Sequence, residues 1–148
     1  MTAHGSDDAL HLAADVRDAL LDHAREGAAR EPPEEICGVL AGERGPPDHV
    51  TGSRRVPNVA THPRTEYELD PAATMSTIDR IEDAGGEAVG FYHSHPESDP
   101  VPSATDRARA TWPGYVYLIV SPPDSVRAYR YTGDDFVELS VHTECRNC

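Results

Sequence analysis

The sequence predicts a single domain of the α/β class (α+β-like), in which helices flank one mixed, curved β-sheet. Two observations carry this prediction. The length of 148 residues suits one domain with one substantial core, and apolar residues recur with helical and strand periods in separate blocks along the chain. Together these blocks predict the element order αββαβαβββ, which favours a mixed sheet with helices packed against it.

The predicted elements follow one another without an internal repeat. In chain order they are a helix at 10–26, strands at 36–40 and 50–59, a helix that starts at Pro71, a strand at 88–92, a short helix that starts near Ser103, and strands at 115–120, 125–131 and 136–141. This order divides the chain into a flexible N-terminus at 1–9, one globular domain at 10–141 and a C-terminal tail at 142–148.

Apolar stripes predict the first two helices. Leu12, Val16 and Leu20 recur every four positions with charged residues between them, which indicates an amphipathic helix that ends before two consecutive prolines. Pro71 suits the first turn of the second helix, because the N–H that proline lacks has no partner there. The two glycines at 85–86 stop that helix.

A capping box predicts the start of the third helix. Ser103 is followed three residues later by Asp106, so that a hydroxyl and a carboxylate can satisfy the free N–H groups of the first turn. The strands are short apolar runs such as 116–120, and turn signals rich in proline, glycine and aspartate separate them.

Charge is the strongest feature of the composition. There are 26 acidic residues and 13 basic ones, and every basic residue is an arginine. Without a basic excess to displace counterions the chain is not expected to bind nucleic acid. The acidity favours adaptation to high salt, although a GC-rich codon bias is the plainer reason for arginine in place of lysine. A chain without lysine cannot accept an isopeptide-linked modifier on a lysine side chain.

The remaining composition favours a cytoplasmic protein. The N-terminus is polar and acidic, unlike a signal peptide, and no apolar run is long enough to span a membrane. The three cysteines are too few for a disulfide framework. A monomer or a weak dimer is expected.

A candidate metal site follows the strand at 88–92. His93 and His95 are two residues apart, so the period of a strand puts both imidazoles on one face. Asp106, on the next helix, supplies an oxygen ligand when the loop folds back. Two imidazoles and one carboxylate suit one zinc ion with a fourth position open to water, which is the catalytic arrangement.

Plainer interpretations of these residues exist. A pair of histidines on a strand is often only a surface feature. Ser103 is most simply an N-cap, and Asp106 is most simply the acid of a capping box. These roles are compatible with a site, because residues three apart share a helix face and one turn can present both a ligand and a hydroxyl.

The spacing of these residues resembles a known signature. The run 93–106 reproduces the pattern H-x-H-x7-S-x2-D of the JAMM (MPN-plus) metalloproteases. The family also carries an upstream glutamate in a context resembling P-x-E-x-C-G, which the run 33–42 matches with Glu35 at the glutamate. Alternation along a strand would send the neighbouring Glu34 to the opposite face. The resemblance covers about 10–141, which would then be the catalytic domain.

The resemblance implies a fold with cytidine-deaminase-like layering and a role for each residue. His93, His95 and Asp106 would hold one zinc ion, Glu35 would act as the general acid and base, and Ser103 would hold the carbonyl oxygen of the scissile bond. It also implies cleavage of amide bonds after the C-terminal Gly-Gly tail of a ubiquitin-like protein. A nucleobase deaminase, which also pairs zinc with a glutamate, is excluded because its H-x-E and P-C-x-x-C elements are missing.

Within the family, the run 90–106 is most similar to the haloarchaeal desampylases. These remove small archaeal modifier proteins (SAMPs) from lysine side chains and from linear fusions. By analogy the tail would add a strand to a sheet edge beside the metal, with 56–59 and 65–69 as the candidate edges. The alternatives are a JAMM peptidase that releases cysteine from a sulfur-carrier protein, and an MPN module that binds ubiquitin-like proteins without cutting them.

Other chemistry-bearing residues have plain interpretations. Cys37 is expected to be a small buried hydrophobe near the site. Cys145 and Cys148 form a C-x2-C pair in the tail, for which a solvated tail or an adventitious disulfide is favoured over a second metal site. The remaining isolated histidines have no partner spacing and are predicted to be surface residues; they are His4, His11, His23, His49 and His62.

Overall fold

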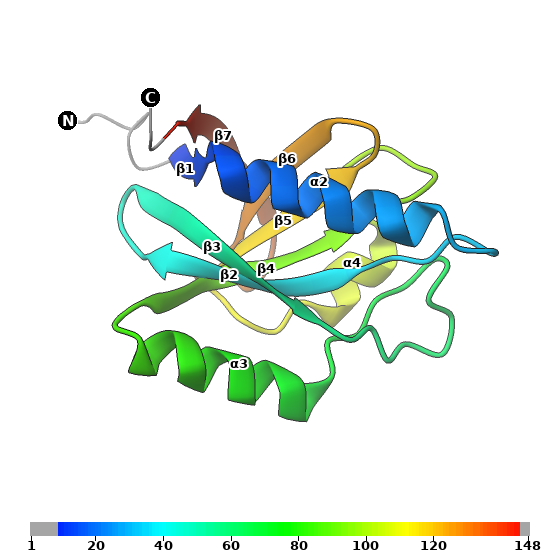
Figure 1. Ribbon diagram of the computed structural model, residues 1–148, viewed down its shortest axis with the longest axis horizontal. Coiled ribbons are helices and arrows are strands. Elements are labelled where there is room, and N and C mark those ends of the chain that lie inside the picture. The colour runs from blue at the N-terminus through cyan, green and yellow to red at the C-terminus, as the bar shows by residue number, and fades with distance from the viewer. Residues whose placement is uncertain (1–8, 146–148) are drawn as a thin grey trace.

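The computed structural model describes residues 9–145, in which the chain forms seven strands and three helices (Figure 1). In chain order they are β1 (Ala9–Ala13), α2 (Ala14–Ala28), β2 (Cys37–Glu43), β3 (Asp48–Val56), α3 (Pro71–Asp83), β4 (Glu87–Ser94), α4 (Ala104–Arg109), β5 (Val116–Ser121), β6 (Ser125–Tyr131) and β7 (Phe136–Glu144). The mixed α/β class predicted from the sequence is confirmed. In this part of the chain, no helix has the length and apolar character needed to cross a membrane.

The strands form one mixed sheet that curves until it closes. Their order is β1-β3-β2-β4-β5-β6-β7, and β1 returns to pair with β7. β1 is parallel to both of its neighbours, and β4 is parallel to β5, while the other pairs are antiparallel. Closure leaves β4 in the middle of the sheet, between β2 and β5, where its C-terminal end is held from both sides.

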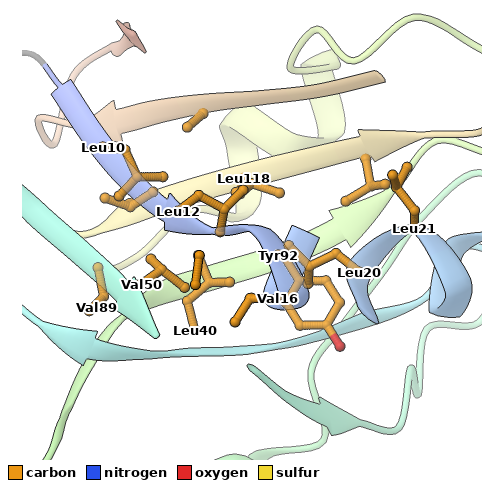
Figure 2. Close-up of a cluster of buried hydrophobic side chains, with 14 of the residues drawn as sticks. Leu10, Leu12, Val16, Leu20, Leu21, Leu40, Val50, Val89, Tyr92 and Leu118 are labelled. Atoms are coloured by element: carbon orange, nitrogen blue, oxygen red, sulfur yellow. The ribbon is translucent and has the colours of Figure 1, made fainter. Parts of the chain in front are cut away.

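Two apolar clusters hold α2 and α3 on opposite sides of the sheet (Figure 1). Figure 2 shows the larger cluster, in which Leu20 of α2 packs with Leu40 and other strand residues. In the second cluster Ile78 of α3 packs with Val39 and Phe91. Val39 and Leu40 are adjacent in β2, so the alternation of a strand supplies both clusters from one element.

The predicted first helix is wrong at its beginning. Residues 10–13 belong to strand β1, and the helix begins only at Ala14. Leu10 and Leu12 are fully buried on one side of a strand, whereas Val16 and Leu20 form the helical stripe. The prediction was wrong because Leu12, Val16 and Leu20 recur every four residues, as in a helix. Leu12 has this spacing from Val16 by coincidence, since it belongs to the strand.

The other element boundaries agree closely with the sequence signals. Pro71 lies in the first turn of α3, and Asp70 caps that helix by accepting a hydrogen bond from the N–H of Ala73. Gly85, with φ of 91°, lies just beyond its end. The strand predicted at 50–59 ends earlier, at Val56, because proline follows it and has no N–H for the ladder.

At the C-terminus, β7 runs to Glu144, so residues 142–144 continue a strand beyond the boundary placed at 141. Of the predicted C-x2-C pair, Cys148 lies outside the described residues. Cys37 is buried, as expected, and burial raises the pKa of its thiol to about 12.

His23 corrects the prediction that the isolated histidines lie at the surface. It belongs to α2, is only 7% exposed, and shares a 2.9 Å hydrogen bond between its Nδ1 and the Tyr92 hydroxyl. Burial lowers the pKa of His23 to about 4, and the positive charge of Arg55 acts in the same direction. The imidazole is therefore neutral in the native protein at neutral pH.

This burial makes the stability of the protein sensitive to acid. As the pH falls from about 6.5 to about 4, the unfolded chain protonates His23 while the native chain does not. The free energy of unfolding should lose up to about 3 kcal/mol from this group across that window. Urea unfolding of the wild type and of His23→Gln at pH 7 and pH 4.5 measures the contribution of His23 to this loss. If both proteins lost the same unfolding free energy between the two pH values, His23 would not be the cause.

Candidate metal centre

The C-terminal end of β4 carries the two histidines. His93 is paired laterally with Cys37 of β2 and with Ile119 of β5, so its backbone is fixed from both sides. His95 follows the strand, and its N–H donates to the carbonyl of Val120 at 2.9 Å. Both side chains are buried, at 2% and 5% exposure. The predicted placement of the two imidazoles on one face holds.

Helix α4 brings the carboxylate to them. Ser103 caps the helix with its Oγ accepting from the Asp106 N–H at 3.0 Å, and Asp106 Oδ2 accepts from the Ser103 N–H at 3.0 Å. The same Oδ2 lies 3.0 Å from Nε2 of His93 and 3.0 Å from Nε2 of His95. The capping box is therefore present and also orients the carboxylate towards both imidazoles.

Glu35 reaches the same place from the segment before β2. Its N–H donates to the carbonyl of Pro63 at 2.7 Å, and its carbonyl accepts from the Asn58 side chain at 2.9 Å. Its side chain is 5% exposed, whereas Glu34 forms a 2.8 Å ion pair with Arg30. The two adjacent glutamates therefore face different surroundings, and only Glu35 enters the candidate site.

These four side chains converge. One ligand atom from each of Glu35, His93, His95 and Asp106 lies within 4.8 Å of the others. Ser103 joins this group through Asp106: its Oγ accepts a hydrogen bond from the helix, which leaves its own O–H free to donate. All five residues singled out in the sequence are thus brought together.

Hydrogen bonds fix the orientation of His95. Its Nδ1 lies 2.8 Å from the carbonyl of Asp99, an acceptor only, so Nδ1 carries the proton and donates it. Nε2 then faces Asp106 and the site, and in the neutral imidazole it carries the lone pair that metal-binding histidines require. His93 is held differently, by the ring of Tyr67, which stacks on it with centroids 4.0 Å apart.

Burial and the local charges set the pKa values. Burial alone would raise the pKa of Asp106, but its hydrogen bonds with His93 and His95 outweigh this effect and hold the pKa well below its usual range. Burial lowers the pKa of His93. Burial also opposes protonation of His95, yet the hydrogen bond with Asp106 raises its pKa overall. For Glu35 burial dominates and raises the pKa to about 8, and the nearby Asp106 adds to the rise.

The donor set fits a borderline divalent metal. Two imidazole Nε2 atoms and one carboxylate oxygen point to a common position, and such a three-ligand set with room for water is typical of catalytic zinc. The second observation is Oε1 of Glu35, a buried oxygen with no hydrogen-bond partner in the part of the chain that the structure describes. A buried carboxyl oxygen of this kind needs a hydrogen-bond partner, and a water molecule beside the metal would supply one.

Sequence reasoning missed three supports of this site. Tyr67 stacks on His93, and the Asp99 carbonyl orients His95. Ser94, between the two histidines, is fully buried and its Oγ accepts from the Ile36 N–H at 2.9 Å, which ties the glutamate segment to β4. Of the three, only Ser94 could have been predicted from the sequence. Strand alternation points its side chain away from His93 and His95 and into the core, where a hydroxyl needs a hydrogen-bond partner.

The two candidate substrate edges are paired with each other. The Val59 N–H donates to the carbonyl of Glu68, and Asp70 donates to Pro57, around a bridge between Asn58 and Leu69. Between these bonds, the backbone groups of Tyr67 and Leu69 form no hydrogen bond within the described residues. The outward backbone groups of 67–69 are therefore free within the described residues, and the stacking of Tyr67 on His93 places this edge beside the site. The choice between 65–69 and 56–59 as the substrate edge stays a prediction.

A cavity of about 440 Å³ adjoins this edge. Its lining includes Tyr67 and Leu69 from the edge, Met75 from α3, and Trp112 and Arg109 from the segment around the end of α4. Because Tyr67 also stacks on His93, the cavity and the candidate metal centre share a wall.

Comparison with known proteins extends these observations. Residues 13–132 match a family described as prokaryotic homologues of the JAB domain. The chain is 63% identical over 135 residues to a desampylase of Haloferax volcanii, covering 91% of this chain and 96% of the relative. It is 36% identical over 142 residues to a CysO-cysteine peptidase of Mycobacterium bovis, covering 90% of each. The solution structure of a Desulfitobacterium hafniense protein superposes with a TM-score of 0.81 at 26% identity, covering 93% of this chain and 94% of that one.

Proposed function

Because the chain belongs to the family of prokaryotic homologues of the JAB domain, we propose that it is a zinc-dependent isopeptidase that removes a ubiquitin-like modifier of the SAMP type. The proposed bond is the amide that follows the modifier's C-terminal Gly-Gly, in lysine conjugates and in linear fusions. The observation that carries the proposal is the convergence of Glu35, His93, His95 and Asp106 within 4.8 Å in a buried site. The 63% identical relative is named a desampylase, which supports the substrate class.

In this proposal His93, His95 and Asp106 hold one zinc ion per chain. When bound, the ion lowers the pKa of water towards neutrality and polarises the carbonyl of the scissile amide. Glu35 accepts the proton of the attacking water and delivers it to the leaving amine, which is a poor leaving group until protonated. Burial raises the pKa of Glu35 to about 8, and a cation nearby would lower that pKa by favouring the carboxylate, which is the form that accepts the proton.

The tail of the modifier is proposed to lie along the edge at 67–69. The unpaired backbone groups of Tyr67 and Leu69 would form the main-chain hydrogen bonds of an added strand. The neighbouring cavity would receive a side chain of the tail, with Met75 and Trp112 as apolar contacts and Arg109 at the rim. Recognition of an extended tail needs no large insertion, in keeping with a chain of 148 residues.

A second candidate function shares the same site residues. The relative that is 36% identical is named a CysO-cysteine peptidase, which favours release of cysteine from the C-terminus of a sulfur-carrier protein. A module that only binds ubiquitin-like proteins is disfavoured, because such a module has no use for four buried, convergent ligand groups. A cytoplasmic location and a monomeric or weakly dimeric state complete the proposal.

One assay tests the proposal against both alternatives. The purified protein is incubated in high salt with a SAMP-type modifier joined through its C-terminal glycine to a lysine side chain, to a linear fusion partner, or to a single cysteine. We expect release of modifier with an intact Gly-Gly end from the first two substrates, loss of release with a chelator, and recovery with zinc. Release from the cysteine adduct alone would support the second candidate, and release from no substrate would refute an isopeptidase.

Ser103 is proposed to donate its O–H to the carbonyl oxygen as that oxygen becomes negatively charged. Ser103→Ala should lower kcat by about 10²–10³-fold, the usual effect of losing one such donor. It should also lower the free energy of unfolding by about 1 kcal/mol through loss of the N-cap, without changing the zinc content. Steady-state kinetics and urea unfolding separate the two effects. Ser103→Thr is the control that keeps both cap and hydroxyl; an unchanged kcat in Ser103→Ala would leave Ser103 as a cap only.

A further inference from the structure

A second group of possible ligands lies across the seam where the sheet closes. His11 of β1 is in lateral register with His49 of β3 on one side and with His142 of β7 on the other. Glu144 follows on the same face of β7, two residues beyond His142. Leu10 and Leu12 on either side of His11 are fully buried, so the intervening histidine is turned outward.

The side chains of this group are in contact. The ring of His11 stacks between the rings of His49 and His142, with centroids 4.8 Å and 5.4 Å away. Nδ1 of His11 lies 3.1 Å from Oε2 of Glu144. One ligand atom from each of His11, His49 and Glu144 lies within 4.8 Å of the others. Strand register, not sequence proximity, therefore assembles three imidazoles and a carboxylate at one place.

Nδ1 of His11 is a buried polar atom whose hydrogen-bonding capacity is not satisfied by the described residues. The atom is shielded from solvent, yet it forms no hydrogen bond within the described residues. The contact with Glu144 is short, but it does not have the geometry of a hydrogen bond. A sheltered nitrogen beside a carboxylate oxygen and a second imidazole is the environment that a bound cation would satisfy.

We propose that His11, His49 and Glu144, with His142 at the flank, form a second zinc site that joins β3, β1 and β7. Imidazole and carboxylate together select zinc and related transition metals over magnesium and calcium, which prefer oxygen ligands alone. Donors on a tetrahedral zinc ion lie about 3.4 Å apart, given bonds of about 2.0–2.1 Å. The three ligand atoms already lie within 4.8 Å of one another, so small side-chain rotations would bring them to this spacing.

The position of the site gives it a structural role. Within the described residues β1 pairs with β3 through Leu10, His11 and Leu12, and it is the strand that completes the closed sheet. An ion bound by residues of β1, β3 and β7 would stabilise the position of β1, whose pairing with β3 is shorter than its pairing with β7. A metal that binds the native but not the unfolded chain raises stability by mass action. The net charge of −13 also attracts divalent cations to the surface.

Zinc titration of the metal-free protein tests the proposal, with bound metal counted after gel filtration. We expect two zinc ions per wild-type chain. In His49→Gln and in Glu144→Gln the affinity of the second site should fall by more than about tenfold, since even outer-shell partners of a metal are worth about 10–100-fold. His62→Gln is the matched control, because His62 is exposed and lies elsewhere on the surface, and it should still bind two.

The variant Asp106→Ala separates this site from the proposed catalytic centre. It should still bind one zinc ion, and its melting temperature should rise when zinc is added; in Asp106→Ala combined with His49→Gln both effects should disappear. His49→Gln alone should keep the peptidase activity of the wild type. One zinc ion per wild-type chain, unchanged in His49→Gln, would overturn the second site while leaving the proposed function intact. Equal zinc affinity of the wild type and both single-site variants would overturn it as well.

Discussion

Glu35→Gln should lower kcat by about 10²–10⁴-fold while leaving the zinc content equal to that of the wild type. This range is the usual contribution of a general acid and base. Glutamine keeps the size and polarity of the side chain, so the buried position is filled and the fold is retained. It cannot accept and return a proton, and in this proposal both the attack of water and the departure of the amine depend on that transfer. Oε1 of Glu35 is the buried oxygen that has no partner among the described residues.

Glu34→Gln is the matched control, because the two glutamates are adjacent and chemically identical. Glu34 is paired with Arg30 at 2.8 Å and is not among the convergent residues of the candidate metal centre. Steady-state kinetics on a lysine-linked conjugate, with zinc measured on the same samples, compare the two variants. Activity within a few-fold of the wild type in Glu35→Gln, or loss of activity in Glu34→Gln instead, would refute the assignment of Glu35.

The candidate site could be predicted from sequence because its residues lie in fixed local contexts. His93 and His95 are related by strand alternation, and Ser103 and Asp106 by the first turn of a helix, so their relative positions follow from local geometry. The loop at 96–102 brings Asp106 to 3.0 Å from both histidines, and no local rule gives the path of this loop. That Asp106 lies close to the histidines was predicted from the resemblance of the spacing to the family motif.

The features missed in the sequence depend on contacts between distant segments. The imidazoles of His11, His49 and His142 meet only because three parallel strands share one register, and β1 was predicted to be part of a helix. His23 is buried because α2 carries it against Tyr92, a partner 69 residues away. In each case the sequence around the histidine is unremarkable in itself, and strand order and helix placement create its environment.

Asp106→Ala should remove zinc from the proposed catalytic centre and abolish turnover. Oδ2 of Asp106 contacts both histidines, at 3.0 Å each, and it also accepts from the Ser103 N–H. Two imidazoles alone make a weak zinc site, since catalytic zinc normally has three protein ligands. The loss also leaves buried polar groups without a partner, which should lower the free energy of unfolding of the metal-free protein by about 1–3 kcal/mol.

Asp70→Ala distinguishes the loss of a metal ligand from the loss of a helix cap. Asp70 caps α3 through the Ala73 N–H at 2.8 Å, and it is not among the convergent residues of the candidate metal centre. It should lower stability by about 1 kcal/mol and leave zinc content and turnover unchanged. Zinc content, kcat and urea unfolding of the two variants are measured side by side. If Asp106→Ala kept the wild-type zinc content, or if both variants lost activity alike, Asp106 would be a structural cap and the ligand set would need another member.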